Sequence, residues 1–205
     1  MFLIKTTSSV GFDPVLVCDG VVLRRATVTD YGEWAALREE SREHLTPWEE
    51  SWTEAETSVA AFRRRLRYFE RQARSAARLP LLVFRREDRV LVGGATLSNI
   101  RYGAAQTATL GYWIGKPFVR RGYGRAAIEA IVRHGFDGLG LNRIEAACQP
   151  ENQPSRALLL KSGFRHEGCA REYLKINGTW RDHDLYALTA GAFEVSEDGT
   201  DGAPA

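Results

Sequence analysis

Short apolar runs along the chain alternate with segments in which apolar residues recur every three or four positions. A short run rich in Val, Ile, Leu, Thr and aromatic residues, bounded by turn residues, is typical of a strand. Seven segments have this composition and are predicted to be strands: residues 21–25, 81–84, 90–98, 107–114, 143–148, 172–176 and 180–188.

Two helices are predicted in the first half of the chain. The first begins at Thr29 or Asp30, whose side chains can cap the free amides of its first turn. A longer helix is predicted over roughly residues 54–78, because apolar residues there form a single helical stripe. The glutamate-rich segment 39–56 contains Pro47, so we expect a loop or a broken helix there.

Two further helices are predicted in the second half. One begins at the glycine pair within residues 122–124 and ends near Gly138 or Gly140. A shorter helix spans residues 152–161 and is stopped by Gly163, since glycine readily takes the left-handed conformation that ends a helix.

The order of these elements predicts an α+β fold. The turn at residues 86–89 and the Asn-Gly pair at residues 177–178 each predict an antiparallel hairpin. We expect a mixed, mostly antiparallel central sheet of about seven strands flanked by helices. It forms a single domain over residues 21–190, after an N-terminal extension of residues 1–20, and the acidic tail of residues 191–205 is predicted to be disordered.

Composition excludes several classes of protein. The 205 residues suffice for one well-packed domain, and a formal charge of +2 is too small to predict nucleic-acid binding. The three cysteines are widely spaced and the histidines share no ligand spacing, so we expect neither a disulfide framework nor a metal site. The sequence contains no apolar run of membrane-spanning length and no secretory leader, so we expect a cytoplasmic protein.

The glycine pair lies between a predicted strand and a helix, in the stretch VRRGYGRAAIEAI of residues 119–131. The first amides of a helix lack intrahelical partners, and the helix dipole adds partial positive charge there. Glycines let the backbone bend so that several amides converge on one anion, and Arg120, Arg121 and Arg125 add charge. This loop is therefore a candidate site for a phosphate or pyrophosphate.

Two common phosphate-binding motifs do not match this loop. The P-loop requires GxxxxGK[ST], which the sequence lacks, and the dinucleotide fingerprint requires a third glycine where Ala127 stands. A plain glycine turn with solvated arginines is the alternative to an anion site.

A second segment, NQPSRALLLKSGF at residues 152–164, completes a pattern. Together the two segments resemble the acyl-CoA motifs of the GNAT superfamily of N-acetyltransferases. The first is similar to that superfamily's glycine loop after the fourth strand, and the second to its Asn-containing helix that ends in Gly-Phe. About 28 residues separate Gly124 from Asn152, which leaves room for one helix and one strand. The resemblance covers roughly residues 21–190.

Three further stretches resemble the Rim-type branch, whose members acetylate the N-termini of ribosomal proteins. They are LTPWE at residues 45–49, LGYWI at 110–114 and YLKINGTWRDH at 173–183. The greatest likeness is to the enzyme for N-terminal alanine. The resemblance implies direct transfer of an acetyl group from acetyl-CoA to a protein α-amine, by a monomer or homodimer with no metal, membrane or specific nucleic-acid partner.

The resemblance also implies where acetyl-CoA binds. Amides of the glycine loop hold the pyrophosphate, while the preceding strand pairs with the pantetheine arm and polarises the thioester carbonyl. Asn152 faces the same arm, although it also fits an ordinary helix N-cap. The implied residues are Tyr112, Trp113, Ile114, Arg120, Arg121, Gly122, Tyr123, Gly124, Arg125, Asn152 and Ser155.

Acetyl transfer to an amine needs a group that takes the amine proton and one that protonates the leaving thiolate. A free α-amine has a pKa of about 7.7–8.0, so a carboxylate or a water chain suffices as base. The candidates are Glu172, Glu49 and Glu50, each of which also fits a surface carboxylate. Many GNAT enzymes place a tyrosine where Leu159 stands, so Ser155, one turn earlier, is the candidate acid.

The acceptor is expected to bind beside the first helices. Glutamates of segment 39–56 would attract a cationic amine or a basic N-terminal tail, although most such runs are solvated faces. The implied acceptor-binding residues are Trp48, Glu49, Glu50 and Asn99. The arginine-rich helix that follows is interpreted as a solvated face with its stems packed on the core, and contact with ribosomal RNA is the alternative.

Two other functions remain open. The same fold and donor could serve a small-molecule amine such as an aminoglycoside, a polyamine or an amino acid derivative. A non-catalytic acyl-CoA-binding accessory protein is the third possibility, because position 159 lacks the tyrosine.

Overall fold

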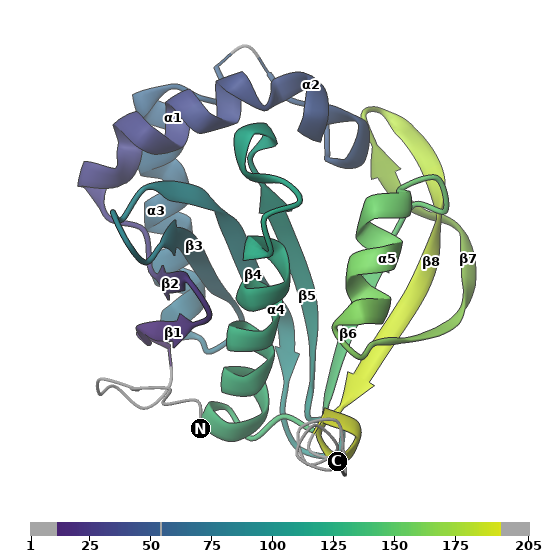
Figure 1. Ribbon diagram of the computed structural model, residues 1–205. Helices are drawn as coiled ribbons and strands as arrows, with labels where there is room; N and C mark the ends of the chain where they lie inside the picture. The colour runs from purple at the N-terminus through teal and green to yellow at the C-terminus, as the bar shows by residue number, and fades with distance from the viewer. Residues whose placement is uncertain (1–11, 54, 194–205) are drawn as a thin grey trace, which may run out of the picture.

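The computed structural model describes residues 12–53 and 55–193 of the chain. Within these residues, eight strands form one sheet in the order β1-β2-β3-β4-β5-β6-β8-β7 (Figure 1). Every neighbouring pair is antiparallel except β5–β6, which is parallel. The strands are β1 (Leu16–Cys18), β2 (Val21–Arg24), β3 (Leu79–Arg85), β4 (Leu91–Arg101), β5 (Thr107–Ile114), β6 (Arg143–Cys148), β7 (Arg165–Ile176) and β8 (Thr179–Thr189).

The mixed α+β class is confirmed, but the predicted number of seven strands is too low. The additional strand is β1, which lies within the predicted extension and pairs with β2 across a tight turn at Gly20. Three residues are too few to show the alternation by which a strand is recognised. The predicted strand at 172–176 is the last part of the longer β7, in which two bulges interrupt the pairing with β8.

The helices follow the predicted order with different ends. The arginine-rich helix α3 is shorter than the predicted segment 54–78, whose first residue lies outside the described residues, as do positions 194–205 of the predicted disordered tail. No helix in the described ranges is long and apolar enough to cross a bilayer. The helices and helical turns are η1 (Val28–Asp30), α1 (Tyr31–Glu40), α2 (Arg42–Leu45), η2 (Thr46–Trp48), α3 (Val59–Arg74), η3 (Lys116–Phe118), α4 (Tyr123–Arg133), η4 (His134–Gly138) and α5 (Gln153–Lys161).

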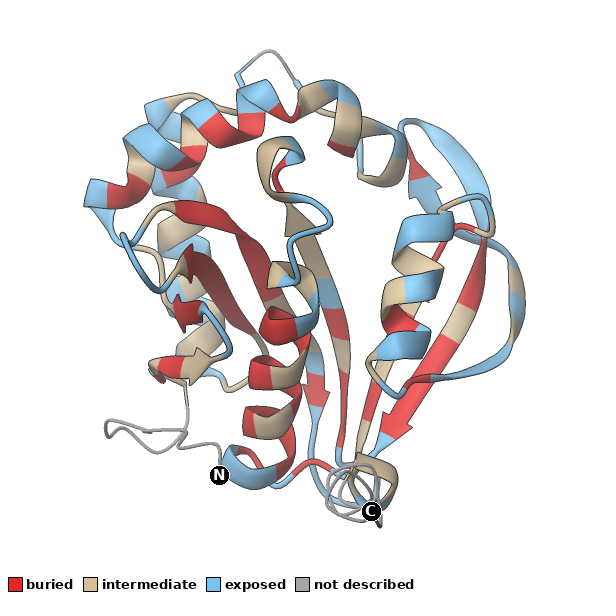
Figure 2. Cartoon of the chain, viewed as in Figure 1, coloured by how far each residue is buried: buried red, intermediate tan, exposed pale blue. Residues whose placement is uncertain are grey.

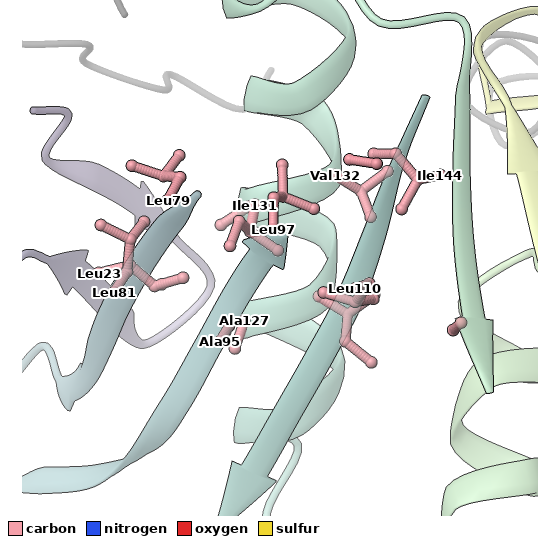
Figure 3. Close-up of a cluster of buried hydrophobic side chains, with 14 of the residues drawn as sticks. Leu23, Leu79, Leu81, Ala95, Leu97, Leu110, Ala127, Ile131, Val132 and Ile144 are labelled. Carbon is pink, nitrogen blue, oxygen red and sulfur yellow. The ribbon is translucent and has the colours of Figure 1, made fainter. Parts of the chain in front are cut away.

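The sheet is covered on both faces, so its central strands are buried on both sides (Figure 2). Helix α4 packs its apolar stripe on one face, where Ile131 joins Leu97 and Leu110 in the larger core cluster (Figure 3). Helices α1 and α3 cover the other face, where Trp34 and Phe62 pack together. Burial of these apolar side chains, worth about 1.5–3 kcal/mol each, holds both layers on the sheet.

The parallel pair β5–β6 is short, and this shapes the site. Pairing extends only from Thr107 opposite Arg143 to Leu110 opposite Ala146. Beyond that point β5 keeps pairing with β4 as far as Ile114, while β6 keeps pairing with β8, and the two strands diverge (Figure 1). Residues 111–114 of β5 therefore present backbone amides and carbonyls on their β6 side with no strand partner.

Candidate functional site

The glycine loop has the backbone geometry of an anion cradle. Gly122 is the residue before α4 and has a φ of +86°, in the left-handed region that glycine adopts without strain. Arg120 also has a positive φ, of +60°, which is uncommon for a residue with a side chain. The first intrahelical hydrogen bond runs from Ala126 N–H to the Gly122 carbonyl at 3.1 Å, so the amides of residues 123–125 are unpaired within the helix.

The space around this loop fits a nucleotide. No heavy atom lies within 4 Å of the position that a Cβ on Gly122 would occupy. An open groove of about 1400 Å³ begins at the loop, and the cationic side chains of Arg121, Arg125 and Lys161 line it together with Gly163 at the end of α5. Asp19 and Glu129 are the acidic residues of its lining. Free amides, positive charge and open volume are the properties that a pyrophosphate requires.

Gly124 has a different role from Gly122. A Cβ at this position would lie 3.0 Å from Leu158 Cδ2 and 3.5 Å from Ile114 Cγ1. The glycine therefore allows the first turn of α4 to lie close to both α5 and the end of β5. This close approach brings the three predicted segments of the acetyl-CoA site to one place.

A pair of hydroxyl groups lies where β5 faces α5. The Tyr112 hydroxyl is 2.7 Å from Ser155 Oγ. Asn152 caps α5, because its Oδ1 accepts a hydrogen bond from the Ser155 amide at 3.1 Å. Burial raises the pKa of Tyr112 above its ordinary value, and the hydrogen bond with Ser155 offsets this rise only in part. The phenol is therefore protonated at neutral pH.

Sequence reasoning assigned Tyr112 to the site through its backbone and missed its hydroxyl. Position 159, at which many GNAT enzymes have a tyrosine, holds a leucine that is fully buried in the core. The hydroxyl instead comes from the neighbouring strand. The sequence feature that predicts the direction of the Tyr112 side chain is the alternation of side chains along β5. It turns Tyr112 towards α5 and Trp113 towards α1.

On the other face of β5, a buried arginine joins α1 to the segment after η2. The Arg38 guanidinium lies 5.0 Å from the ring centroid of Trp113 and 4.0 Å from that of Trp52. It donates two hydrogen bonds to the Glu49 carboxylate, at 2.9 and 2.6 Å, and the Trp52 indole N–H donates a third at 2.9 Å. Arg38 was not predicted, although a charged residue one turn after Trp34 on the buried side of α1 is a visible signal.

The other predicted acceptor-binding residues and the candidate base Glu172 lie at three separate places. Trp48 ends η2, half-buried, and Glu50 follows in the same segment, exposed. Asn99 occupies a bulge of β4, where its amide group is 3.4 Å from Thr109 Oγ1. Thr109 lies in the part of β5 that still pairs with β6, before the two strands diverge. Glu172 is exposed on a bulge of β7, and its backbone N–H donates to Asp182 at 2.8 Å. The structure thus keeps Trp48, Glu49 and Glu50 in one segment but places Asn99 on β4 and Glu172 on β7.

We expect Arg38→Met to lower the free energy of unfolding by about 2–3 kcal/mol, measured by urea denaturation. The side chain is only 6% exposed, and its loss would leave the Glu49 carboxylate without its charged partner. Arg42→Met is the matched control, because Arg42 pairs with Glu39 on the surface of the same region. The control should lose less than about 1 kcal/mol, and equal losses would show that burial of the first pair is immaterial.

Comparisons with known proteins agree with this geometry. The chain matches the acetyltransferase (GNAT) domain family over residues 21–165. It is 32% identical to the ribosomal protein uS5-alanine N-acetyltransferase of Escherichia coli (strain K12), over 85% of this chain and 90% of that protein. It is also 32% identical to the probable N-acetyltransferase YjcK of Bacillus subtilis (strain 168), over 82% and 93% of the two chains.

A solved structure shows the same fold. RimJ of Mycobacterium smegmatis, in complex with CoA-disulfide, superimposes with a TM-score of 0.80 at 34% identity, covering 87% of this chain and 89% of that one. The sequence resemblance to the GNAT superfamily is thereby confirmed. The chain belongs to the GNAT family of N-acetyltransferases, and its relatives include ribosomal-protein acetyltransferases.

Proposed function

We propose that this enzyme transfers an acetyl group from acetyl-CoA to the α-amine of a protein N-terminus in the cytoplasm. The acceptor that we propose is the N-terminal alanine of a ribosomal protein. The observation that carries the proposal is the meeting of the free amides of α4 and the Tyr112–Ser155 hydroxyl pair at the split between β5 and β6. Its relatives of the Rim type, which act on ribosomal proteins, support the choice of acceptor.

Three parts of the chain would hold acetyl-CoA. The amides of residues 123–125, with Arg121 and Arg125 beside them, would bind the pyrophosphate. The unpartnered edge of residues 111–114 would pair with the pantetheine amides as a neighbouring strand does. An amide of that edge would also stabilise the charge that develops on the thioester oxygen.

The hydroxyl pair would supply the proton that the leaving thiolate needs. Ser155 lies in the first turn of α5, with its own amide fixed by Asn152. Ser155 Oγ would give its proton to the thiolate and take the phenol proton of Tyr112, and the phenolate would regain a proton from solvent before the next turnover. Burial disfavours the phenolate, so Tyr112 is protonated at the start of each turnover. Two hydrogen-bonded hydroxyl groups would therefore perform the role that one tyrosine of α5 performs in many members of the family.

The acceptor would enter from the opposite face of β5, beside Trp113. Arg38 and Glu49 hold Trp52 and the segment after η2 at this face. Because Glu49 already accepts three hydrogen bonds there, we assign it to positioning the acceptor wall rather than to taking the amine proton. Glu50 and Glu172 remain candidate bases, and bulk water can also accept the proton of an amine whose pKa is about 8.

The test is an acetylation assay against peptides varied at their first two residues. We expect turnover with peptides that begin with Ala, and with Ser or Thr at lower rates, and mass spectrometry should place the acetyl group on the α-nitrogen. Peptides blocked at the α-amine but carrying a free lysine are the control and should not react. Turnover confined to aminoglycosides, polyamines or free amino acid derivatives would replace the peptide acceptor, and binding of acetyl-CoA without any turnover would refute catalysis.

A further inference from the structure

The positive charge of this protein is concentrated on α3. The helix carries six arginines and one glutamate, a net charge of +5. Because the whole chain has a formal charge of +2, the remaining residues carry a net charge of −3. Residues 116–133, which include the glycine loop, are the other strongly basic region, with a net charge of +4. The proposed function uses the charge of the glycine loop and leaves that of α3 without a role.

Three of these arginines share one exposed face. Arg64, Arg67 and Arg71 are spaced three and four residues apart, so their side chains lie on one side of the helix, and all three are exposed. Within residues 12–53 and 55–193, no carboxylate forms an ion pair with them. Arg65, on a different side of the helix, pairs with Glu56 at 2.5 Å. We call Arg64, Arg67, Arg71 and the 38% exposed Tyr68 among them the arginine face.

A further exposed arginine and tyrosine follow the point where β4 meets the chain that leaves α3. The Ala77 carbonyl accepts a hydrogen bond from the Ile100 amide at 3.3 Å, which fixes the end of β4 beside the chain that leaves α3. The next two residues, Arg101 and Tyr102, are both exposed. Exposed arginines and tyrosines therefore occur both on α3 and at the end of β4, where Arg101 Nε also donates a hydrogen bond to Thr107 Oγ1 at 3.2 Å.

We propose that the arginine face docks on the phosphate backbone of structured RNA. The partner is chosen on the basis of the proposed function, since a ribosomal-protein acceptor is found together with RNA. Guanidinium groups bind phosphate oxygens in pairs of hydrogen bonds, and release of condensed cations from RNA drives the association. Side chains cannot read the narrow major groove of A-form RNA, so this contact is independent of base sequence.

An anionic bilayer fits this surface less well than RNA. Helices that bind membranes insert an apolar face beside their basic residues. The apolar side of α3 is already used, because Phe62 is 2% exposed and packs with Trp34 against the sheet. The exposed side chains of α3 are mostly arginines with Tyr68, Glu70 and Ala60, and Val59 is the one large aliphatic side chain exposed in this described helix. This surface suits a phosphate chain better than the interior of a bilayer.

The acidic segment beside α3 makes the docking directional. Glu40, Glu43 and Glu50 are exposed on α1, on α2 and after η2, on the side where we propose that the acceptor enters. They would repel a phosphate backbone from that entrance and attract a basic protein tail. RNA held on α3 and a basic N-terminus held at the acidic segment are the two components of one ribonucleoprotein particle.

The test compares two triple variants of the full chain, R64Q/R67Q/R71Q and the charge-matched control R86Q/R89Q/R165Q, whose arginines are exposed elsewhere. Binding of a fluorescent RNA hairpin with a stem of about 16 base pairs is followed by anisotropy across a series of KCl concentrations. For the arginine-face variant we expect affinity at low salt to fall at least about tenfold, and the slope of log K against log salt to become less steep by about two to three. The control should change affinity less than about twofold.

Equal losses in the two variants would overturn the proposal, because net charge alone would then explain the binding. So would binding of the wild type to phosphatidylserine vesicles with no binding to the RNA hairpin. Acetylation of a free peptide is measured in the same samples and should be equal in all three proteins. A wild type that binds RNA through α3 but acetylates no peptide would refute the proposed function and leave the docking surface standing.

Discussion

Gly122→Val should weaken acetyl-CoA binding about 100-fold, measured by isothermal titration calorimetry. A β-branched residue cannot take the φ of +86° without strain that costs about 1–2 kcal/mol, so the loop would shift. In a shifted loop the amides of residues 123–125 no longer point at the pyrophosphate. Loss of one hydrogen bond to a charged group costs about 1.5–3 kcal/mol more. Together these effects amount to about 3 kcal/mol, which is roughly 100-fold in affinity.

Gly103→Val is the matched control for this change. Gly103 has a φ of +67° in the turn between β4 and β5, and no heavy atom lies within 4 Å of the Cβ position. It therefore imposes the same backbone strain on the folded state without touching the proposed site. We expect both variants to lose similar stability in urea, while only Gly122→Val loses affinity. If Gly122→Val bound acetyl-CoA as tightly as the wild type, the pyrophosphate would not lie on these amides.

The parts of the site that the sequence predicted are those built from neighbouring residues. The glycine loop, the Asn152 cap and the end of α5 each depend on spacing within a few positions, which turn and cap chemistry makes recognisable. The antiparallel hairpins were predicted for the same reason, since their turns are local. The strand β1 was not, because so short a strand is specified by its pairing with β2 rather than by its own pattern.

The contacts that the sequence did not predict join residues that are far apart in the chain. Tyr112 and Ser155 are 43 positions apart, and their hydroxyl groups meet only because α5 packs against the end of β5. Arg38 reaches Trp113 because α1 lies across that strand. No local pattern specifies either distance, and both depend on how elements pack. The alternation of side chains along β5, which directs Tyr112 and Trp113 to opposite faces, is the sequence feature that indicates on which face each of these contacts forms.

Tyr112→Phe and Ser155→Ala should each lower kcat about 100-fold, with the KM for acetyl-CoA changed by less than about threefold. Removing either hydroxyl breaks the path by which a proton reaches the thiolate. General acid catalysis typically raises the reaction rate by about 10²–10⁴-fold. Because burial raises the pKa of Tyr112, the donor stays protonated as pH rises. We therefore expect the wild-type rate to rise as the acceptor amine loses its proton, through about pH 7.7–8.0, and to stay level up to about pH 10.

The double variant distinguishes a shared path from two separate effects. If Tyr112 and Ser155 act in series, removing both should cost no more than removing one, so the two losses will not multiply. Tyr31→Phe is the control, because it removes a phenol hydroxyl that bonds the Thr57 carbonyl, away from Ser155, and it should leave kcat within about twofold. Losses that multiply to about 10⁴-fold would mean that the hydroxyl groups act independently. Full activity in either single variant would show that the leaving thiolate takes its proton from water. Water would then have to reach the thiolate between the diverging strands β5 and β6.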